Sequence, residues 1–258
     1  DGGERFKVSG RGELHLEILI ETMRREGYEL EVSRPQVILK KMGDQVLEPV
    51  EMVVIEVDGQ YQGAVMQALG ARKAEMKGIK ITSSTSIRME FIITSRALIG
   101  FRSEFLLMTR GSGVMCQNFL EYQVYKGELP ARQIGVQVSN GSGKVVAFAL
   151  WNLQDRGEMF IAPGDITYEG MIVGIYNKGV DIVVNPQKEK KLTNMRSSTC
   201  DMAIQLIPPR KINLEFALVF IDDDELVEIT PLNIRLRKKQ LKEVDRTRTS
   251  RKIRSDNE

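Results

Sequence analysis

Histidine and cysteine, which build many metal and nucleophilic sites, are scarce in this chain. It has one histidine, His15, and two cysteines, Cys116 and Cys200, in 258 residues. A lone histidine cannot form a histidine metal triad, and the cysteines are too far apart for a metal spacing or a disulfide framework. The acidic run at residues 222–225 lacks the alternate spacing of a calcium loop and is expected to be a helix-to-strand turn. We therefore expect no metal site, no catalytic residues and a reducing compartment.

Long apolar runs are also absent. No stretch approaches membrane-spanning length, and no signal peptide opens the chain. We expect a cytoplasmic protein that is monomeric and has no membrane partner. Because the first residue is Asp1 rather than methionine, we also expect the chain to be the C-terminal part of something longer.

No complete glycine-rich phosphate-binding motif is present, although two segments contain part of one. Residues 140–144 read NGSGK, but a phosphate loop needs a glycine where Val138 stands and a hydroxyl residue where Val145 stands. The pair Gly10 and Gly12 lacks the third glycine of a dinucleotide fingerprint. We therefore expect this chain to hold no nucleotide cofactor and to be no enzyme by itself.

What is present describes an ordinary globular protein. Hydrophobic residues make up 42% and charged residues 28%, and the net charge is only +2. The length suits two or three small domains. The charge is nevertheless uneven, and we interpret residues 235–254 either as a solvated face or as a polyanion-binding tail. Ten basic residues lie there against two acids: Arg235, Arg237, Lys238, Lys239, Lys242, Arg246, Arg248, Arg251, Lys252 and Arg254.

The hydrophobic pattern of the first half indicates small α/β units. A strand at 5–8, a helix at 13–26 and a strand at 28–32 form a β-α-β unit that resembles half of a domain. Residues 48–126 follow the order β-α-β-β-α-β, the split βαβ or ferredoxin-like pattern, which places both helices on one face of an antiparallel sheet. Its strands are expected at 52–57, 78–81, 87–93 and 114–125 and its helices at 62–74 and 96–108, with Val65, Leu69, Leu98, Phe101 and Phe105 buried.

From residue 129 onward strands dominate. Asn140-Gly141 predicts a tight hairpin turn between strands at 133–138 and 144–150. One helix is expected at 214–221, capped by Asn213. The predicted fold class is therefore α+β, with ferredoxin-like domains followed by a β-rich C-terminal domain with one helix; its further strands are expected at 159–162, 166–176, 180–184, 202–207 and 226–237.

One long polar stretch, residues 185–199, lies between two of these predicted strands. It has no apolar periodicity, and it carries four basic residues against Glu189. A loop this long is usually functional or disordered, and its mixture of basic and short polar side chains suits contacts with phosphates and sugars. The alternative is a soluble connection that touches nothing. The candidate RNA-binding residues are Lys188, Lys190, Lys191, Thr193, Asn194, Arg196 and Ser197.

Three groups of motifs together resemble one family. Residues 5–16 with Arg34-Pro35 are similar to the second half of domain III in translational GTPases of the elongation factor G type. Residues 63–66 and 95–102 are similar to their domain V. The motifs at 140–141, 153–157, 190–196 and 220–228 resemble the C-terminal domain particular to the BipA/TypA GTPases. The resemblance divides the chain into residues 1–44 (half of domain III), 45–127 (domain V), 128–242 (the specific C-terminal domain) and 243–258 (a basic tail).

The resemblance implies a ribosome- and RNA-binding arm of a translational GTPase. The family acts in translation and in assembly of the large ribosomal subunit, notably under stress or cold. Its loop matching residues 188–198 reaches toward the peptidyl-transferase centre and the acceptor end of A-site tRNA, and domains III and V lie near the factor-binding site. The domain that binds GTP and Mg²⁺ and hydrolyses GTP to GDP and phosphate has no counterpart in this chain.

Two other functions fit the same sequence. Paired ferredoxin-like folds often sense small molecules, and the chain could also be a purely structural interaction protein. Salt separates these alternatives, because binding through phosphates weakens steeply with salt and binding in an apolar pocket does not.

Overall fold

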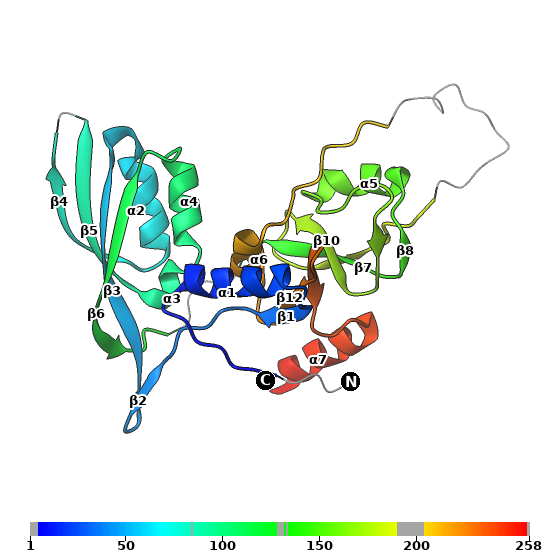
Figure 1. Cartoon of the computed structure of the whole chain (residues 1–258), viewed down its shortest axis with the longest axis horizontal. Coiled ribbons are helices and arrows are strands. Elements are labelled where there is room, and N and C mark those ends of the chain that lie inside the picture. The colour runs from blue at the N-terminus through cyan, green and yellow to red at the C-terminus, as the bar shows by residue number, and fades with distance from the viewer. Residues whose placement is uncertain (1–4, 84, 128–131, 133, 190–203, 257–258) are drawn as a thin grey trace. The chain divides into compact units, whose positions relative to one another are not determined.

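The computed structural model describes residues 5–83, 85–127, 132, 134–189 and 204–256, and for residues 250–256 it describes the backbone alone. The chain forms two compact units (Figure 1). Unit 1 joins Asp1–Arg34 with Arg132–Glu258, and unit 2 is Pro35–Ala131. Unit 2 is continuous in sequence, whereas unit 1 is built from two distant segments.

Unit 2 has the ferredoxin-like order that its sequence predicts. Its main sheet runs β6-β3-β5-β4 with every pair antiparallel, and β2 pairs with the first residues of β3. The first and third strands are thus central, as the split βαβ pattern requires. The elements are β2 (Lys40–Met42), β3 (Gln45–Asp58), η1 (Gly59–Tyr61), α2 (Gln62–Ala71), β4 (Glu75–Ile81), β5 (Ser86–Thr94), α3 (Ser95–Leu98), α4 (Phe101–Met108) and β6 (Val114–Val124).

The helices of unit 2 pack on a single face of this sheet. Alternate residues of β3 and β5 point to that face, because successive side chains of a strand point to opposite sides. Side chains from α2, α3 and α4 join them in one core. All five core residues predicted from the sequence are buried: Val65, Leu69, Leu98, Phe101 and Phe105.

The single helix predicted over 96–108 is broken in two. Ile99 has extended ψ and Gly100 has a φ of 72°, a left-handed conformation that suits glycine. The guanidinium of Arg72 stabilises the break by donating hydrogen bonds to the carbonyls of Ala97 (2.6 Å) and Ile99 (3.0 Å). These contacts satisfy carbonyls that the interrupted helix leaves without partners.

Unit 1 contains a six-stranded sheet of order β1-β12-β13-β10-β7-β11. Most pairs are antiparallel, but β11 is parallel to β7. A separate two-stranded ladder joins β8 to β9. The elements are α1 (Glu13–Arg25), β1 (Leu30–Ser33), β7 (Gly135–Ser139), β8 (Gly143–Lys144), α5 (Ala147–Leu153), η2 (Gln154–Arg156), β9 (Ile166–Thr167), β10 (Met171–Tyr176), β11 (Ile182–Val184), α6 (Leu214–Phe220), β12 (Glu225–Ile229), β13 (Ile234–Lys238) and α7 (Glu243–Asp256).

Both faces of this sheet are covered. On one face α1 and α6 pack over a core that includes Ile20, Ile172 and Leu236. On the other face α5 packs over a second core that includes Leu150 and Val173. The neighbours Ile172 and Val173 of β10 belong to different cores, as expected for a strand with both faces buried.

Several expectations for unit 1 are wrong. Residues 147–153 form the helix α5, because Leu150 and Leu153 are buried at helical spacing; the C-terminal region therefore has a further helix besides the expected α6. The predicted hairpin at residues 140–141 does not form, since β7 pairs with β10 and β11 instead. No strand forms over residues 5–8 or 204–207, and residues 202–203 lie outside the described part of the chain. The run 226–237 is two strands, β12 and β13, rather than one.

The first segment of the chain is integrated into unit 1 up to Arg34. Ile20 of α1 joins the core beside α6, and β1 pairs with β12 from Leu30↔Ile229 to Ser33↔Leu226. Residues 35–44 belong to unit 2. The assignment of residues 1–44 to half of a domain III, and the other boundaries at 127 and 242, stay predictions.

Candidate nucleic-acid interface

The polar stretch 185–199 leaves the sheet of unit 1 at the end of β11. Val184 and Pro186 are buried, and Lys188 and Glu189, the next charged residues, are exposed. Lys188 is thus the one predicted RNA-binding residue that the described part of the chain includes, and it lies where the chain leaves the core. The other six predicted residues lie outside the described residues: Lys190, Lys191, Thr193, Asn194, Arg196 and Ser197.

The outgoing end of this stretch is held by Gln187. Its side-chain amide donates hydrogen bonds to the Thr167 hydroxyl (2.6 Å) and the Gly141 carbonyl (2.9 Å), and it lies 3.4 Å from the Ser139 hydroxyl. Thr167 and Ser139 are fully buried. The Pro186 carbonyl also accepts a hydrogen bond of 3.1 Å from the backbone of residue 146. Gln187 therefore ties the chain to the turn at residues 139–143 and to β9.

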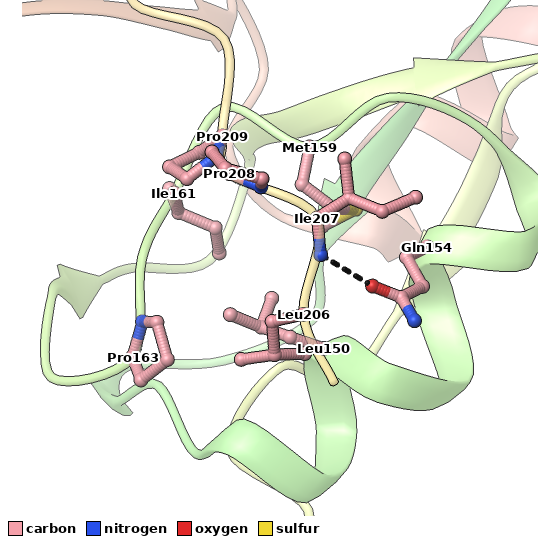
Figure 2. Close-up of a pocket in the computed structure, with 9 residues that line it drawn as sticks. All are labelled: Leu150, Gln154, Met159, Ile161, Pro163, Leu206, Ile207, Pro208 and Pro209. Atoms are coloured by element: carbon pink, nitrogen blue, oxygen red, sulfur yellow. Dashed lines mark hydrogen bonds between the residues drawn. The ribbon is translucent and has the colours of Figure 1, made fainter. Parts of the chain in front are cut away.

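The returning end is held by Gln154, which lies in η2 directly after α5. Its amide nitrogen donates to the Gln205 carbonyl and its oxygen accepts from the Ile207 backbone N–H, each at 3.1 Å. Figure 2 shows the second of these bonds at the edge of a small pocket. The pocket has a volume of about 80 Å³ and is mainly apolar; it is lined by Leu150, Gln154, Met159, Ile161, Pro163, Leu206, Ile207, Pro208 and Pro209.

Some cations of the basic run at residues 235–254 form ion pairs within unit 1 and are not available to bind a partner. Arg235 pairs with Glu228 at 3.4 Å, and Arg237 pairs with Glu31 of β1 at 3.1 Å. Lys238 is 3% exposed. All three lie in β13, so the interpretation of the whole run as a polyanion-binding tail is too broad.

Lys238 belongs to a buried network of charges. Its ammonium lies 2.6 Å from Asp181, 2.8 Å from Asp224 and 2.9 Å from Glu225. The carboxylate of Glu225 also accepts two hydrogen bonds from Arg132, at 2.8 and 2.9 Å. The run 222–225 therefore serves as a helix-to-strand connection with internal ion pairs, as predicted for a turn.

The charges of this network shift each other's pKa values. Burial by itself raises the pKa of Glu225, but hydrogen bonds from Arg132 and the positive charges of Lys238 and Arg132 outweigh burial and lower that pKa. Burial by itself lowers the pKa of Lys238, yet the charge of Glu225 and hydrogen bonds to Asp181 and Asp224 raise it overall. Both groups are therefore charged at neutral pH.

The network reaches the strand that leads into residues 185–199. Asp181 immediately precedes β11, and its carboxylate accepts a 3.0 Å hydrogen bond from the backbone N–H of Val136 in β7. Through Asp181, Lys238 helps to fix the start of β11 against β7. The ionic network and the Gln187 contacts thus hold the two ends of the same short strand.

After β13 the chain forms α7, for which the sequence predicted only a basic tail. The helix begins beside the connection between β9 and β10, where the Glu243 backbone N–H donates a 3.1 Å hydrogen bond to the Glu169 carboxylate. Arg246 donates to the carbonyls of Gln240 and Leu241, so it stabilises the start of the helix. Among the described side chains that follow β13, the exposed cations are Lys239, Lys242 and Arg248. The Lys239 ammonium donates a hydrogen bond to the Asp223 carbonyl, and Arg248 lies 3.9 Å from Asp245.

The histidine and one of the two cysteines lie in the described part of the chain. His15 is exposed, and its Nδ1 accepts a 3.3 Å hydrogen bond from the Arg11 backbone. Cys116 is exposed, and Cys200 is outside the described residues. Within the described ranges, no group of three or more histidine, cysteine or acidic side chains is placed to hold a metal ion, and no helix is long and apolar enough to cross a membrane.

Gln154, Gln187 and the Lys238 network were missed by sequence reasoning. Each acts through partners that are distant in the chain, such as Gln205 for Gln154 and Asp181 for Lys238. A single sequence contains no signal for such partners. The local composition of residues 185–199 marked the loop itself but not what holds it.

Comparison with known proteins agrees with both units of this fold. The model of the elongation factor G C-terminus matches residues 45–133, which places the ferredoxin-like unit in the class of translation-factor domains. The model of the TypA/BipA C-terminal domain matches residues 134–243. The chain thus combines an elongation factor G C-terminus with a TypA/BipA C-terminal domain, and it matches the C-terminal part of BipA proteins.

Individual relatives show the same correspondence. The chain is 52% identical over 97% of its length to a Salmonella typhimurium protein described as "Large ribosomal subunit assembly factor BipA". It is 52% identical over 99% of its length to the Escherichia coli K12 protein of that description, and 51% identical over 95% to the one from Buchnera aphidicola. The matches cover 42%, 42% and 41% of these relatives, so the chain spans about two fifths of their length.

Proposed function

We propose that this chain is the ribosome-binding C-terminal arm of a BipA/TypA translational GTPase that acts in assembly of the large ribosomal subunit. The observation that carries the proposal is the 52% identity, over nearly the whole chain, to proteins described as large ribosomal subunit assembly factors. In this proposal the partner is the ribosome in the cytoplasm, and the protein acts in translation and under stress or cold as its family resemblance implies.

The GTPase activity of the proposed whole protein resides outside the matched region. The family models matched here are two C-terminal domains, and the chain covers about two fifths of its relatives. GTP, Mg²⁺ and hydrolysis to GDP and phosphate are therefore assigned to the remaining part. The role left to this chain is recognition rather than chemistry.

For the recognition itself, we propose that residues 185–199 contact ribosomal RNA and A-site tRNA. Lys188, Lys190, Lys191 and Arg196 would bind phosphates, because cations gain affinity there by releasing counterions. The short polar side chains would orient the loop on sugar or base edges; these are Thr193, Asn194 and Ser197. The exposure of Lys188 at the end of a firmly anchored strand supports this assignment.

The sensing of a small molecule is the second candidate, and the described pocket does not favour it. Its volume of about 80 Å³ is below the ~300 Å³ at which typical small-molecule sites begin. It also offers one polar side chain, Gln154, and that amide is already bonded to the backbone of residues 205 and 207. RNA binding needs no such cavity.

The test is co-sedimentation of the chain with large ribosomal subunits across a salt series. Replacing Lys188, Lys190, Lys191 and Arg196 together with alanine should weaken binding and flatten its salt dependence, by about one unit of slope for each phosphate that is no longer neutralised. Folding should hardly change, because substitutions in exposed loops usually shift stability by less than about 0.5 kcal/mol.

The matched control is the uncharged triple variant of the same loop, with Thr193, Asn194 and Ser197 replaced by alanine. It should lower affinity but leave the salt slope as in the wild type, because every phosphate-binding cation is retained. A quadruple variant that binds normally at every salt concentration and unfolds early would show that the loop is structural.

A further inference from the structure

We propose that the helix α5 presents Trp151 as a stacking platform for an unpaired RNA base. This inference rests on the proposed function, because it adds a further contact to the same RNA-binding arm. Three exposed cations lie near the two ends of the helix: Lys144, Lys188 and Arg156. All of these residues belong to the described part of unit 1.

Trp151 is the single tryptophan of the sequence, and its side chain is 46% exposed. Tryptophan is highly buried on average, because its large apolar surface gains free energy by leaving water. The helix that carries it does face a core, which its residues Leu150 and Leu153 join. Trp151 lies outside that core, so its ring is on the outer side of α5.

The indole ring is supported from one side by Phe148. Residues three apart on a helix share a face, and the two ring centroids are 6.3 Å apart with planes inclined at 39°. Rings tilted in this way are not stacked on each other, so the phenyl ring does not occupy the indole face. The half-buried Phe148 thus restrains Trp151 while leaving it open to a planar ligand.

Two of the cations lie near the start of α5. Lys144 ends β8, three residues before the first residue of the helix, and Figure 1 shows β8 and α5 at the same end of unit 1. The backbone N–H of Val146, which caps the helix, donates a 3.1 Å hydrogen bond to the Pro186 carbonyl. Lys188 follows Pro186 by two residues, so this bond brings it to the same end of the helix.

The third cation, Arg156, is in η2 directly after α5. None of the three cations forms an ion pair with another described residue. Exposed acids are close in sequence or by backbone contact, namely Asp155, Asp165 and Glu189, so the local charge is balanced. The cations can therefore contact individual phosphates, but most of the affinity at this site should come from stacking.

The surroundings of the ring favour RNA over a protein partner. The core of a protein interface is depleted of charged residues, whereas a base-stacking site needs one aromatic ring among polar and cationic groups. Over residues 142–156 every exposed residue other than Trp151 is polar or charged: Ser142, Lys144, Asn152, Asp155 and Arg156. The base must be unpaired, because the bases of an RNA duplex are stacked on one another.

The first test uses the fluorescence of Trp151, which reports on this site alone because the chain has no other tryptophan. The 258-residue chain is titrated with an unstructured oligouridylate of about ten nucleotides, a length within the usual range of single-strand sites. Saturable quenching is expected, and a duplex of the same length should quench less. Absence of quenching by the single strand up to roughly 0.1 mM, the weak end of non-specific nucleic-acid binding, overturns the proposal.

The second test compares the affinities of variants for the same RNA, carrying a fluorescent label, across a salt series. Trp151→Leu keeps an apolar side chain but loses the ring, so it should bind roughly tenfold more weakly with the wild-type salt slope. Trp151→Phe retains an aromatic face and should recover most of that loss. Lys144→Gln should instead flatten the slope by about 0.7, the value for one phosphate contact on a single strand.

The matched control is Phe119→Leu, which removes an aromatic ring that is 59% exposed on β6 of unit 2. It should bind RNA as the wild type does. Thermal midpoints are measured for all variants, so that a folding defect in Trp151→Leu is distinguished from a lost contact. Wild-type affinity in Trp151→Leu, or an equal loss in Phe119→Leu, overturns the proposal.

The third test measures binding to large ribosomal subunits and separates this site from the proposed function. Trp151→Leu should bind the subunits roughly tenfold more weakly at each salt concentration. If the wild-type chain binds and Trp151→Leu binds equally well, the stacking site is wrong and the proposed function stands. If Trp151→Leu loses affinity for subunits but not for the oligouridylate, the ring contacts a ribosomal protein and the RNA assignment is wrong. If the wild-type chain does not bind subunits, the proposed function itself fails.

Discussion

Both units bury apolar cores, but they differ in the charged side chains that are buried beside those cores. Unit 2 buries a continuous apolar core and one glutamate, Glu48, whose carboxylate is bonded to Arg96 and to the backbone of Lys126. Unit 1 buries both Glu225 and Lys238, and Glu225 also pairs with the half-buried Arg132. Unit 1 therefore depends on charges brought together from segments far apart in the sequence.

The paired charges of unit 2 are also closer together in the sequence than those of unit 1. Glu48 and Arg96 lie within one ferredoxin-like motif, and their pair joins β3 to α3. Glu225 is linked to Arg132, 93 residues earlier, and shares Lys238 with Asp181. Removing a core side chain should therefore affect each unit separately, whereas removing a charge in unit 1 should affect several of its elements at once.

The largest expected effect comes from Phe105→Ala in unit 2. Phe105 is 1% exposed, and removing a buried phenylalanine side chain should destabilise its unit by about 3–5 kcal/mol. Hydrogen exchange should accelerate over residues 35–131 and stay unchanged in unit 1. The control is Leu107→Ala on the same helix, where the side chain is 81% exposed and the change should stay within about 0.5 kcal/mol. Equal acceleration in both units would remove the distinction between them.

A smaller but still large effect is expected from Lys238→Met in unit 1. The methionine keeps much of the length but leaves Glu225 and Asp181 without their shared cation, and breaking a buried ion pair costs about 3 kcal/mol or more. Urea unfolding measures this change. Lys239→Met, at the exposed neighbouring position, should shift stability by a small fraction of that amount. A loss below about 1 kcal/mol for Lys238→Met would mean that Arg132 alone neutralises the network.

The smallest expected effect is a pH dependence that belongs to unit 1. Because folding lowers the pKa of Glu225, its ionised form contributes stability above the ordinary glutamate pKa of 4.5, and that contribution is lost as pH falls through the lowered value. The stability gap between wild type and Glu225→Gln in urea unfolding should therefore be widest near neutral pH and should narrow below 4.5. A gap that is constant from neutral to acidic pH would contradict the role of the charge.

Prediction from the sequence succeeded where the determining contacts are local. In unit 2 the alternation of strands and helices around Val65 and Phe101 indicated both the fold and the buried face, and the break at Gly100 was the main element missed. In unit 1 the dipeptide Asn140-Gly141 indicated a hairpin, but β7 found its partners in β10 and β11 instead. Local turn preference was overruled by burial of β7 on both faces, since all five of its residues are buried.

For the candidate interface, too, the sequence predicted the local features and missed the contacts between distant residues. The composition of residues 185–199 was enough to single out a polar, basic stretch at the end of a strand, and Lys188 is exposed there. The cations at 235, 237 and 238 looked equally available in the sequence, yet ion pairs across the sheet occupy them. Charge counted along a chain does not distinguish a solvated cation from an internal one.

The sequence alone was sufficient to predict the α+β class and the ferredoxin-like unit and to recognise the motifs of the family. These features depend on the periodicity of hydrophobic residues and on short motifs, which are local properties of the chain. Folding in three dimensions was needed to establish that β1 pairs with β12, that Lys238 meets Asp181, and that Gln154 bonds the backbone of residues 205 and 207. Those contacts join residues far apart in sequence, and a hydrogen bond or ion pair forms only after folding has brought its two partners within a few ångströms.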